Sequence, residues 1–232
     1  MADVETQRDA VLDALDNVAA RLAEEKGYLT DLDSAIGDAD HGANMQRGFG
    51  EAAEKREAFA EMDPDEVVKN VGTTLISNVG GASGPLYGGS IMFASQELED
   101  GITAETSVAF AEAYLDKVKD RGGAEVGSKT MVDALVPAVH TYKKSIEQDD
   151  LPPLTALAKA VDAAERGVEF TVPLKALKGR SSFLDWRSVG HQDPGATSTL
   201  FILEELLATA EEYLDGAIDR DAHAGDAARR DE

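Results

Sequence analysis

The sequence predicts an all-α fold, a barrel or bundle of about eight antiparallel helices. Apolar residues recur at helical spacing along most of the chain, whereas no segment shows the period-two alternation of a half-buried strand. The longest β-like run, residues 168–172, is short and ends at a proline. Clusters rich in glycine and charge separate the helical stretches at residues 33–44, 80–90, 121–131 and 179–195. Four such loops at one end of an antiparallel bundle make a single site.

The first two long helices have clear signals. An apolar stripe at spacings of four, three and four runs along the first helix, and Gly27 is its predicted stop. Asp63 and Pro64 are typical of a cap followed by proline at the first helical position. The first stripe consists of Val11, Leu15, Val18 and Leu22, and the predicted buried face of the second helix is Val67, Val68, Val71, Leu75 and Ile76.

Three more helices follow from similar signals. Thr103 is predicted to cap a helix that runs to about residue 120, and residues 154–168 form an alanine-rich helix. The predicted core face of the last long helix is Phe201, Ile202, Leu206 and Leu207. Together the helices form one predicted domain, residues 1–214, followed by a flexible acidic tail at residues 215–232.

Length, charge and composition exclude several classes of protein. The chain has 232 residues and no cysteine, so it can bury a sizeable core but forms no disulfide or thiolate metal site. It shows no signal-peptide pattern and no bilayer-spanning apolar run, so we expect a cytoplasmic protein without membrane contact. The net charge of −23 repels nucleic acid, and any anionic ligand needs local neutralisation. The same charge suggests adaptation to a salt-rich cytosol, where self-repulsion is screened.

Three aspartates lie within the run Leu-Asp-Ser-Ala-Ile-Gly-Asp-Ala-Asp-His-Gly of residues 32–42. Asp33, Asp38 and Asp40 offer the hard oxygen ligands that Mg²⁺ prefers, with room left for water and phosphate oxygens. One aspartate alone would be read as a helix cap. A calcium EF-hand does not fit, because counting twelve residues from Asp38 reaches Phe49 where a glutamate is required. The spacing therefore predicts a phosphoryl-transfer metal site.

A glycine-rich segment at residues 80–89 holds five glycines in ten residues. Glycines let the backbone approach a ligand closely and present its N–H groups, so the segment favours phosphate binding over a simple connector. Residues 121–131 resemble a P-loop, but Ser128 stands where the lysine belongs and the preceding segment is predicted to be helical. We reject that motif, and Met131 remains a candidate to pack on a base.

The fourth cluster, residues 179–196, combines a cation with a turn before the last helix. Arg180 can clamp a phosphate with two hydrogen bonds, and Asp193, Pro194 and Gly195 form the turn. Trp186 is more simply explained as a packing anchor. The sequence has neither the Gly-x-Ser-x-Gly elbow of a serine hydrolase nor a His-Glu-x-x-His zinc motif.

Four blocks together resemble the nucleotide-binding L subunit family of dihydroxyacetone kinase: residues 32–45, 80–88, 127–135 and 190–198. The resemblance covers about residues 5–210. It implies an all-α barrel with the nucleotide site at one end, and two Mg²⁺ ions held by Asp33, Asp38 and Asp40. One departure is Ser128, where the family usually has aspartate in a Gly-Asp-Lys-Thr block.

The resemblance also implies the site residues. Asp33, Asp38, Asp40 and Arg180 are the expected catalytic residues. The positions that match nucleotide-contacting residues, for ADP or ATP, are His41, Gly42, Ala43, Asn44, Ala82, Ser83, Gly122, Met131, Arg180, Asp193, Pro194 and Gly195.

In this family a separate subunit or domain holds the triose on a histidine, so we expect a dihydroxyacetone-binding partner subunit. The phosphate donor is either free ATP or a phosphocarrier of the phosphoenolpyruvate-dependent phosphotransferase system, with ADP retained as cofactor. Stand-alone L subunits more often use the phosphocarrier. The alternatives are the nucleotide-binding part of a fatty acid kinase, a nucleotide-sensing interaction protein and a purely structural helical bundle.

Overall fold

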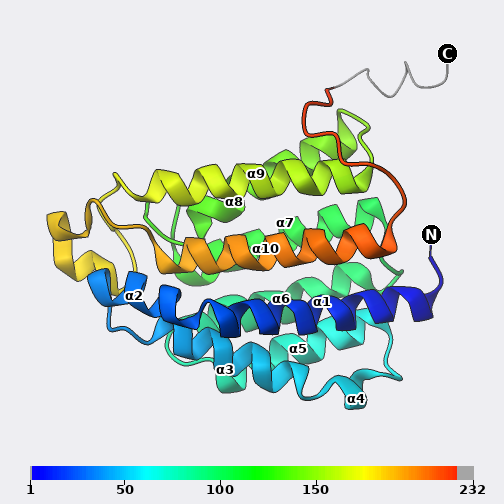
Figure 1. Cartoon of the computed structure of the whole chain (residues 1–232), viewed down its shortest axis with the longest axis horizontal. Coiled ribbons are helices and arrows are strands. Elements are labelled where there is room, and N and C mark those ends of the chain that lie inside the picture. The colour runs from blue at the N-terminus through cyan, green and yellow to red at the C-terminus, as the bar shows by residue number, and fades with distance from the viewer. Residues whose placement is uncertain (1, 224–232) are drawn as a thin grey trace.

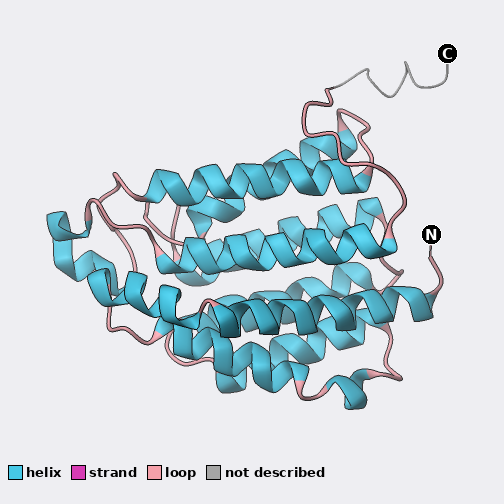
Figure 2. Cartoon of the chain, viewed as in Figure 1, coloured by secondary structure: helices cyan, strands magenta, loops and turns pink. Residues whose placement is uncertain are grey.

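The computed structural model describes residues 2–223. Within that range the chain is all-helical and has no strand (Figures 1 and 2). None of the described helices is long and apolar enough to cross a membrane. The elements are α1 (Val4–Glu24), α2 (Lys26–Ile36), α3 (His41–Ala53), α4 (Arg56–Phe59), α5 (Pro64–Asn78), the π-helix η1 (Gly84–Gly88), α6 (Gly89–Ala94), the 3₁₀ helix η2 (Ser95–Leu98), α7 (Ala104–Gly122), α8 (Val132–Glu147), α9 (Pro153–Thr171), the 3₁₀ segment η3 (Arg180–Ser188) and α10 (Pro194–Tyr213).

Eight of these helices close into a barrel. In the order α1, α3, α5, α6, α7, α8, α9 and α10, each helix packs against the next, and α10 packs against α1. The helices run roughly parallel to the long axis of the molecule (Figure 1). The predicted all-α barrel of about eight helices is therefore confirmed.

The core has two parts. The larger lies inside the barrel and includes Leu22, Met45 and Leu75, all fully buried. The smaller lies between α8, α9 and α10 and is rich in alanine. Small residues let α8 and α9 approach closely: a Cβ on Gly167 would lie 2.1 Å from the Asp133 carbonyl oxygen.

Helix starts agree with the sequence better than helix ends do. Thr103 caps α7 through a hydrogen bond that its Oγ1 accepts from the Thr106 N–H at 3.1 Å, and Pro64 begins α5 after Asp63. Gly27 is not a helix stop. The first helix ends at Glu24, and Gly27 lies inside α2, which begins at once.

Two apolar side chains and one short run also differ from the prediction. Ile76 and Leu206 were assigned to buried faces, but each is 38% exposed because it lies at the edge of its stripe. The β-like run at residues 168–172 belongs mainly to the last turn of α9.

The first part of the predicted flexible tail, residues 215–223, lies against α9. Lys159 Nζ donates hydrogen bonds to the Arg220 and Ala222 carbonyl oxygens, and Arg220 forms an ion pair with Asp162. Residues 224–232, the rest of the predicted tail, lie outside the described residues.

Candidate functional site

The four glycine- and charge-rich clusters meet at one end of the barrel. They surround a cavity of about 180 Å³ beside the end of α2 and the starts of α3 and α10. The convergence that helix counting predicted is therefore confirmed. Of the predicted site residues, those that line the cavity are Asp33, Asp38, Asp40, His41, Ala82, Ser83, Met131, Arg180, Asp193, Pro194 and Gly195.

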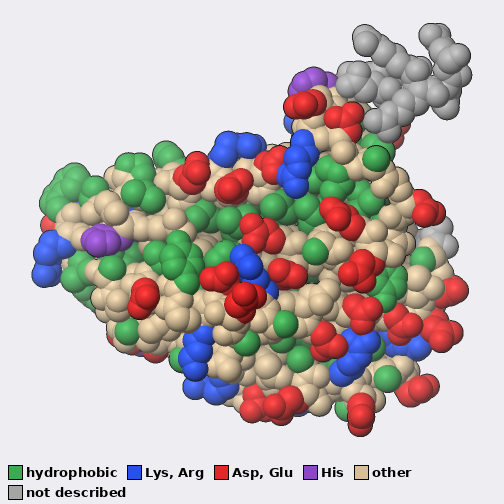
Figure 3. All heavy atoms as spheres, in the orientation of Figure 1, with side chains coloured by type: hydrophobic (Ala, Val, Ile, Leu, Met, Phe, Trp, Pro, Cys, Tyr) green, Lys and Arg blue, Asp and Glu red, His purple; other side chains and the backbone are tan. Residues whose placement is uncertain are grey.

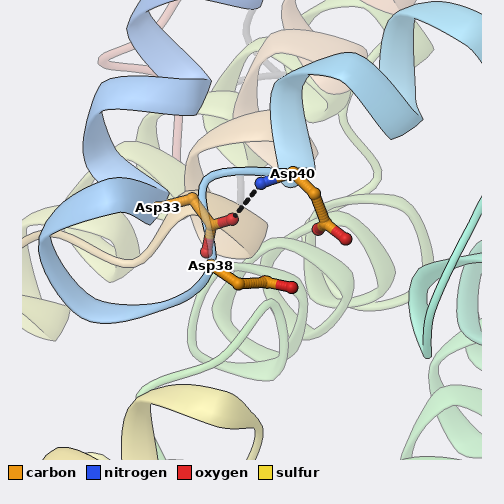
Figure 4. A group of neighbouring side chains, drawn as sticks. All are labelled: Asp33, Asp38 and Asp40. Carbon is orange, nitrogen blue, oxygen red and sulfur yellow. Dashed lines mark hydrogen bonds between the residues drawn. The ribbon is translucent and has the colours of Figure 1, made fainter.

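The three aspartates come together on the turn between α2 and α3. One carboxylate oxygen from each of Asp33, Asp38 and Asp40 lies within 4.8 Å of the others. Asp33 is buried, and its Oδ2 accepts hydrogen bonds from the N–H groups of Asp40 at 2.9 Å and His41 at 3.1 Å. The side chains of Asp38 and Asp40 point to the same side of the turn (Figure 4). The group can hold a divalent cation, because its donors are all hard oxygens.

Two small residues make this turn possible. A Cβ on Gly37 would lie 2.0 Å from Asp33 Oδ1, so only glycine leaves space for the buried carboxylate. Ala39, between the two exposed aspartates, has a left-handed backbone with φ of 61°. The turn therefore places three like charges side by side, which is unfavourable unless a cation lies among them.

The glycine-rich segment lines the same cavity as the aspartates. Gly81 has a positive φ of 65°, and a Cβ on Gly80 would lie 2.8 Å from Asn44 Oδ1. The segment then enters the π-helix η1, where Tyr87 is almost fully buried. The backbone at Gly80 thus lies close to the Asn44 side chain of α3, whereas no atom lies within 4 Å of a Cβ placed on Gly81, and both glycines line the cavity.

Tyr87 connects this segment to the other two. Its hydroxyl oxygen lies 3.0 Å from the Gly195 carbonyl oxygen, to which it can donate, and 2.9 Å from Ser198 Oγ. Ser198 Oγ also lies 2.8 Å from His41 Nε2. Burial raises the pKa of Tyr87 to about 12 and lowers the pKa of His41, although Asp33 and Asp40 oppose the second shift. Neutral side chains thus join the turn between α2 and α3, which carries the three aspartates, to η1 and α10.

Lys129 lines the cavity and hydrogen-bonds two backbone carbonyl groups beside it. It has a positive φ of 60° and no exposed surface, and its Nζ donates to the Thr171 carbonyl oxygen at 2.7 Å and to that of His191. Burial lowers the pKa of Lys129, against the opposing charges of Asp193 and Asp133. The ammonium therefore joins the end of α9, at Thr171, to the fourth cluster, at His191.

Nearby, Ser128 and Asp133 fix the turn that precedes α8. Ser128 is buried, and its Oγ accepts a hydrogen bond from the Glu125 N–H at 3.0 Å. Asp133 accepts from the N–H groups of Gly127 and Thr130, at 2.5 and 2.9 Å. The serine that departs from the family pattern therefore has a structural role within its own turn.

The fourth cluster supplies one exposed cation and one buried carboxylate. Arg180 is 57% exposed and forms an ion pair with Asp38 across the cavity mouth. Asp193 caps α10 by accepting a hydrogen bond from the Ala196 N–H at 2.8 Å. Burial raises the pKa of Asp193 to about 7. Asp193 therefore organises the start of α10 through its carboxylate.

Four predicted residues do not line the cavity. Gly42 packs against α2, where a Cβ would lie 2.2 Å from the Lys26 carbonyl oxygen, and Ala43 is half-buried on α3. Asn44 is buried behind the glycine segment and accepts a hydrogen bond from Arg47 at 2.7 Å. Gly122 ends α7. Their predicted contact with a ligand stays a prediction.

The sequence argument missed the residues that position the site. Lys129, Tyr87 and Ser198 all lie within the blocks that carried the family resemblance, so the sequence already indicated that they are near the site. Their roles could not be predicted, because each residue bridges segments that lie far apart in the chain. Lys178 and Gly179 also line the cavity and were not predicted.

Comparisons with known proteins agree with this geometry. The DAK2 domain family matches residues 35–208. The ADP-binding subunit DhaL of the PEP-dependent dihydroxyacetone kinase of Escherichia coli is 45% identical over 82% of this chain and 91% of its own length. The ADP-binding subunit DhaL of the PTS-dependent dihydroxyacetone kinase of Lactococcus lactis is 39% identical over 86% of this chain and 96% of its own.

A solved structure shares the fold. The dihydroxyacetone kinase of C. freundii, in complex with AMP-PNP and Mg²⁺, superposes with a TM-score of 0.65 at 25% identity over 90% of this chain. The chain spans about a third of the length of that kinase, 34%. The range matched by the family and the identity to both subunits lead to one conclusion: the chain belongs to the DAK2 domain family and, within it, to the DhaL group.

Proposed function

We propose that this chain is the nucleotide-binding subunit of a dihydroxyacetone kinase. In this role it binds ADP or ATP with Mg²⁺ and transfers a phosphoryl group to dihydroxyacetone held on a partner subunit. The observation that carries the proposal is the aspartate cluster, whose ligand oxygens lie within 4.8 Å of one another at the wall of a glycine-lined cavity. The names of the related DhaL subunits support the choice of substrate.

The aspartate cluster fits Mg²⁺ on its own chemistry. Its donors are carboxylate oxygens, and Gly37 leaves the space that the buried Asp33 needs. Asp38 and Asp40 are exposed, so each keeps an oxygen available to a second ion, and we propose a two-ion site. Bound there, Mg²⁺ would neutralise charge on the phosphate oxygens.

The remaining residues would bind and orient the nucleotide. Gly80, Gly81 and Ala82 line the cavity, and backbone N–H groups of such a segment suit phosphate oxygens. Arg180 can stabilise charge that develops on the transferred group, because its guanidinium already lies at the mouth. Met131 offers apolar surface for the base. Catalysis in such a site comes mainly from positioning and charge neutralisation.

We assign activation of the acceptor hydroxyl to the partner subunit. Among the described residues that line the cavity, the carboxylates belong to the proposed metal site or cap α10, and the Lys129 ammonium is bound to two carbonyl oxygens. His41 also lines the cavity, and its Nε2 is paired with Ser198 Oγ, so none of these groups is an unengaged general base at the cavity.

We further propose that a phosphocarrier of the phosphotransferase system recharges retained ADP, since the related subunits are described as PEP- or PTS-dependent. The test is to denature freshly purified protein and identify released nucleotide by chromatography. ADP near one per chain supports a retained cofactor. An empty protein that binds ATP with Mg²⁺ favours an exchanging, ATP-dependent kinase. A protein that binds neither nucleotide in high salt contradicts the proposed function.

A further inference from the structure

A basic segment with two exposed aromatic rings projects beside the cavity. Residues 173–192, which include η3, form the outermost part of the site end, drawn in yellow in Figure 1. Phe183 is 85% exposed and Trp186, the single tryptophan of the sequence, is 72% exposed, so the prediction that Trp186 is a packing anchor is wrong. Large apolar side chains exposed together on one short segment are typical of an interaction site, and packing within the chain leaves both rings mostly uncovered.

The rings stand on a fixed segment. Asp185, which lies between them, has a left-handed φ of 51°, a conformation that costs a non-glycine residue energy. Three contacts hold it: Lys175 Nζ donates to Asp185 Oδ1 at 2.6 Å, Ser188 Oγ donates to the Asp185 carbonyl oxygen at 2.6 Å, and the Ala176 N–H donates to Ser188 Oγ at 2.9 Å. Rigid aromatic side chains lose little entropy on binding.

The charge of the segment is opposite to that of the protein. Residues 173–192 carry Lys175, Lys178, Arg180 and Arg187 against the single acid Asp185, while the whole chain has a net charge of −23. Figure 3 shows hydrophobic side chains and a basic group gathered at this end, and acidic side chains over most of the same face. A partner that binds here therefore has an acidic surface.

Position identifies the kind of partner. Gly179, Arg180 and Ser181 of this segment line the cavity, so the two rings belong to the same short segment that borders it. Phosphoryl transfer requires the reacting atoms within about 3–3.5 Å of each other, so a protein that presents the acceptor must cover this mouth.

We propose that Phe183 and Trp186 anchor the subunit that presents dihydroxyacetone, and that its docking face is an apolar recess rimmed by carboxylates. This inference rests on the proposed function. A second copy of this chain is a less suitable partner for this surface. Each copy has a net charge of −23, so two copies repel each other everywhere outside the basic segment.

The single tryptophan gives a direct assay. The full chain is mixed with the dihydroxyacetone-binding subunit of the same organism in KCl buffer, and tryptophan emission and acrylamide quenching are recorded after subtraction of the partner's signal. We expect a blue shift and loss of quenching as Trp186 becomes buried. Affinity is then measured for a variant that carries both Phe183→Ala and Trp186→Ala, with binding of Mg-ADP measured in parallel.

Phe93→Ala is the matched control. Phe93 is 43% exposed, and its ring lies 4.3 Å from Lys117 Nζ, as that of Trp186 lies 5.1 Å from Lys175 Nζ. We expect the double variant to lose at least about tenfold in partner affinity and the control to lose nothing, since truncation of an aromatic anchor has effects of this size. Mg-ADP affinity should stay unchanged in both.

Each other outcome is decisive. A double variant that binds the partner like the wild type, a Trp186 that stays quenchable in the complex, or a wild-type chain that buries Trp186 only by self-association overturns the docking inference. Those results leave the proposed function intact as long as the wild type binds Mg-ADP. A wild type that binds no nucleotide contradicts the proposed function itself.

Discussion

Gly37→Ala tests whether the aspartate turn is built around a buried carboxylate. The new Cβ would lie 2.0 Å from Asp33 Oδ1 and 2.9 Å from Asp33 Cγ, and contacts below 3.0 Å essentially do not occur. The Asp33 carboxylate must therefore move by about 1 Å, a displacement that can cost a site of this kind about a hundredfold in activity.

The same movement weakens the turn. The hydrogen bonds that Asp33 Oδ2 accepts from Asp40 and His41 involve a charged acceptor, and each contributes about 1.5–3 kcal/mol. If the two bonds are partly lost, the free energy of unfolding falls by about 2–3 kcal/mol. Loss of a correctly placed metal ligand should lower Mg-ADP affinity by at least about tenfold, or 1.4 kcal/mol.

Gly27→Ala is the control for the general effect of alanine in α2. No atom lies within 4 Å of the position that its Cβ would take, and alanine in a helix is favoured over glycine by about 1 kcal/mol. Calorimetric titration with Mg-ADP and denaturant unfolding are measured for both variants. Wild-type affinity in Gly37→Ala, with Gly27→Ala also unchanged, would refute the assignment of Asp33 to the metal site.

Three further predictions concern the metal site, a buried acid and the surface charge. Asp38→Asn should abolish Mg²⁺-dependent ADP binding while the melting temperature stays near that of the wild type, because Asp38 lies at the exposed mouth; unchanged calorimetric affinity would rule out the ligand role. The pKa of Asp193 is about 7 in the folded protein, above its ordinary value of 3.8, so the folded state binds more protons and this group's contribution to stability falls as the pH rises from about 4 to about 7. Asp193→Asn keeps a capping side chain and should flatten that part of the stability profile measured by urea unfolding; an unaltered slope would contradict the assignment. The free energy of unfolding should rise with KCl concentration because salt screens the net charge of −23. A protein that is equally stable without salt would contradict the hypothesis of salt adaptation.

Local signals predicted the helices and the place of the site, but not the contacts between distant segments. The helix caps at Thr103 and Asp63 depend on residues no more than three positions apart in sequence, so they could be predicted. Gly27 misled because glycine often ends a helix, whereas here the chain resumes its helix after one residue. Ile76 and Leu206 lie at the edges of apolar stripes, where tertiary packing decides exposure.

The site residues divide along the same line. Asp33, Asp38 and Asp40 were found because three acids in eight residues have no common structural explanation. Tyr87 and Lys129 were missed because their partners lie between 42 and 112 residues away in sequence. A single sequence carries no signal for a bridge of that length, and only the assembled barrel reveals which side chains hold the loops in register.

The source of positive charge at the site follows from these bridges. A polyphosphate bound to a chain with a net charge of −23 needs local cations, and the buried lysine of the cavity cannot serve, because its ammonium is bound to two backbone carbonyl oxygens. Arg180 and Lys178 remain at the mouth, and Arg180 is already paired with Asp38. Two side chains cannot balance both a polyphosphate and three aspartates. If the chain binds a nucleotide here as proposed, bound divalent cations would supply the missing positive charge, which is the physical reason to expect that nucleotide binding depends on Mg²⁺.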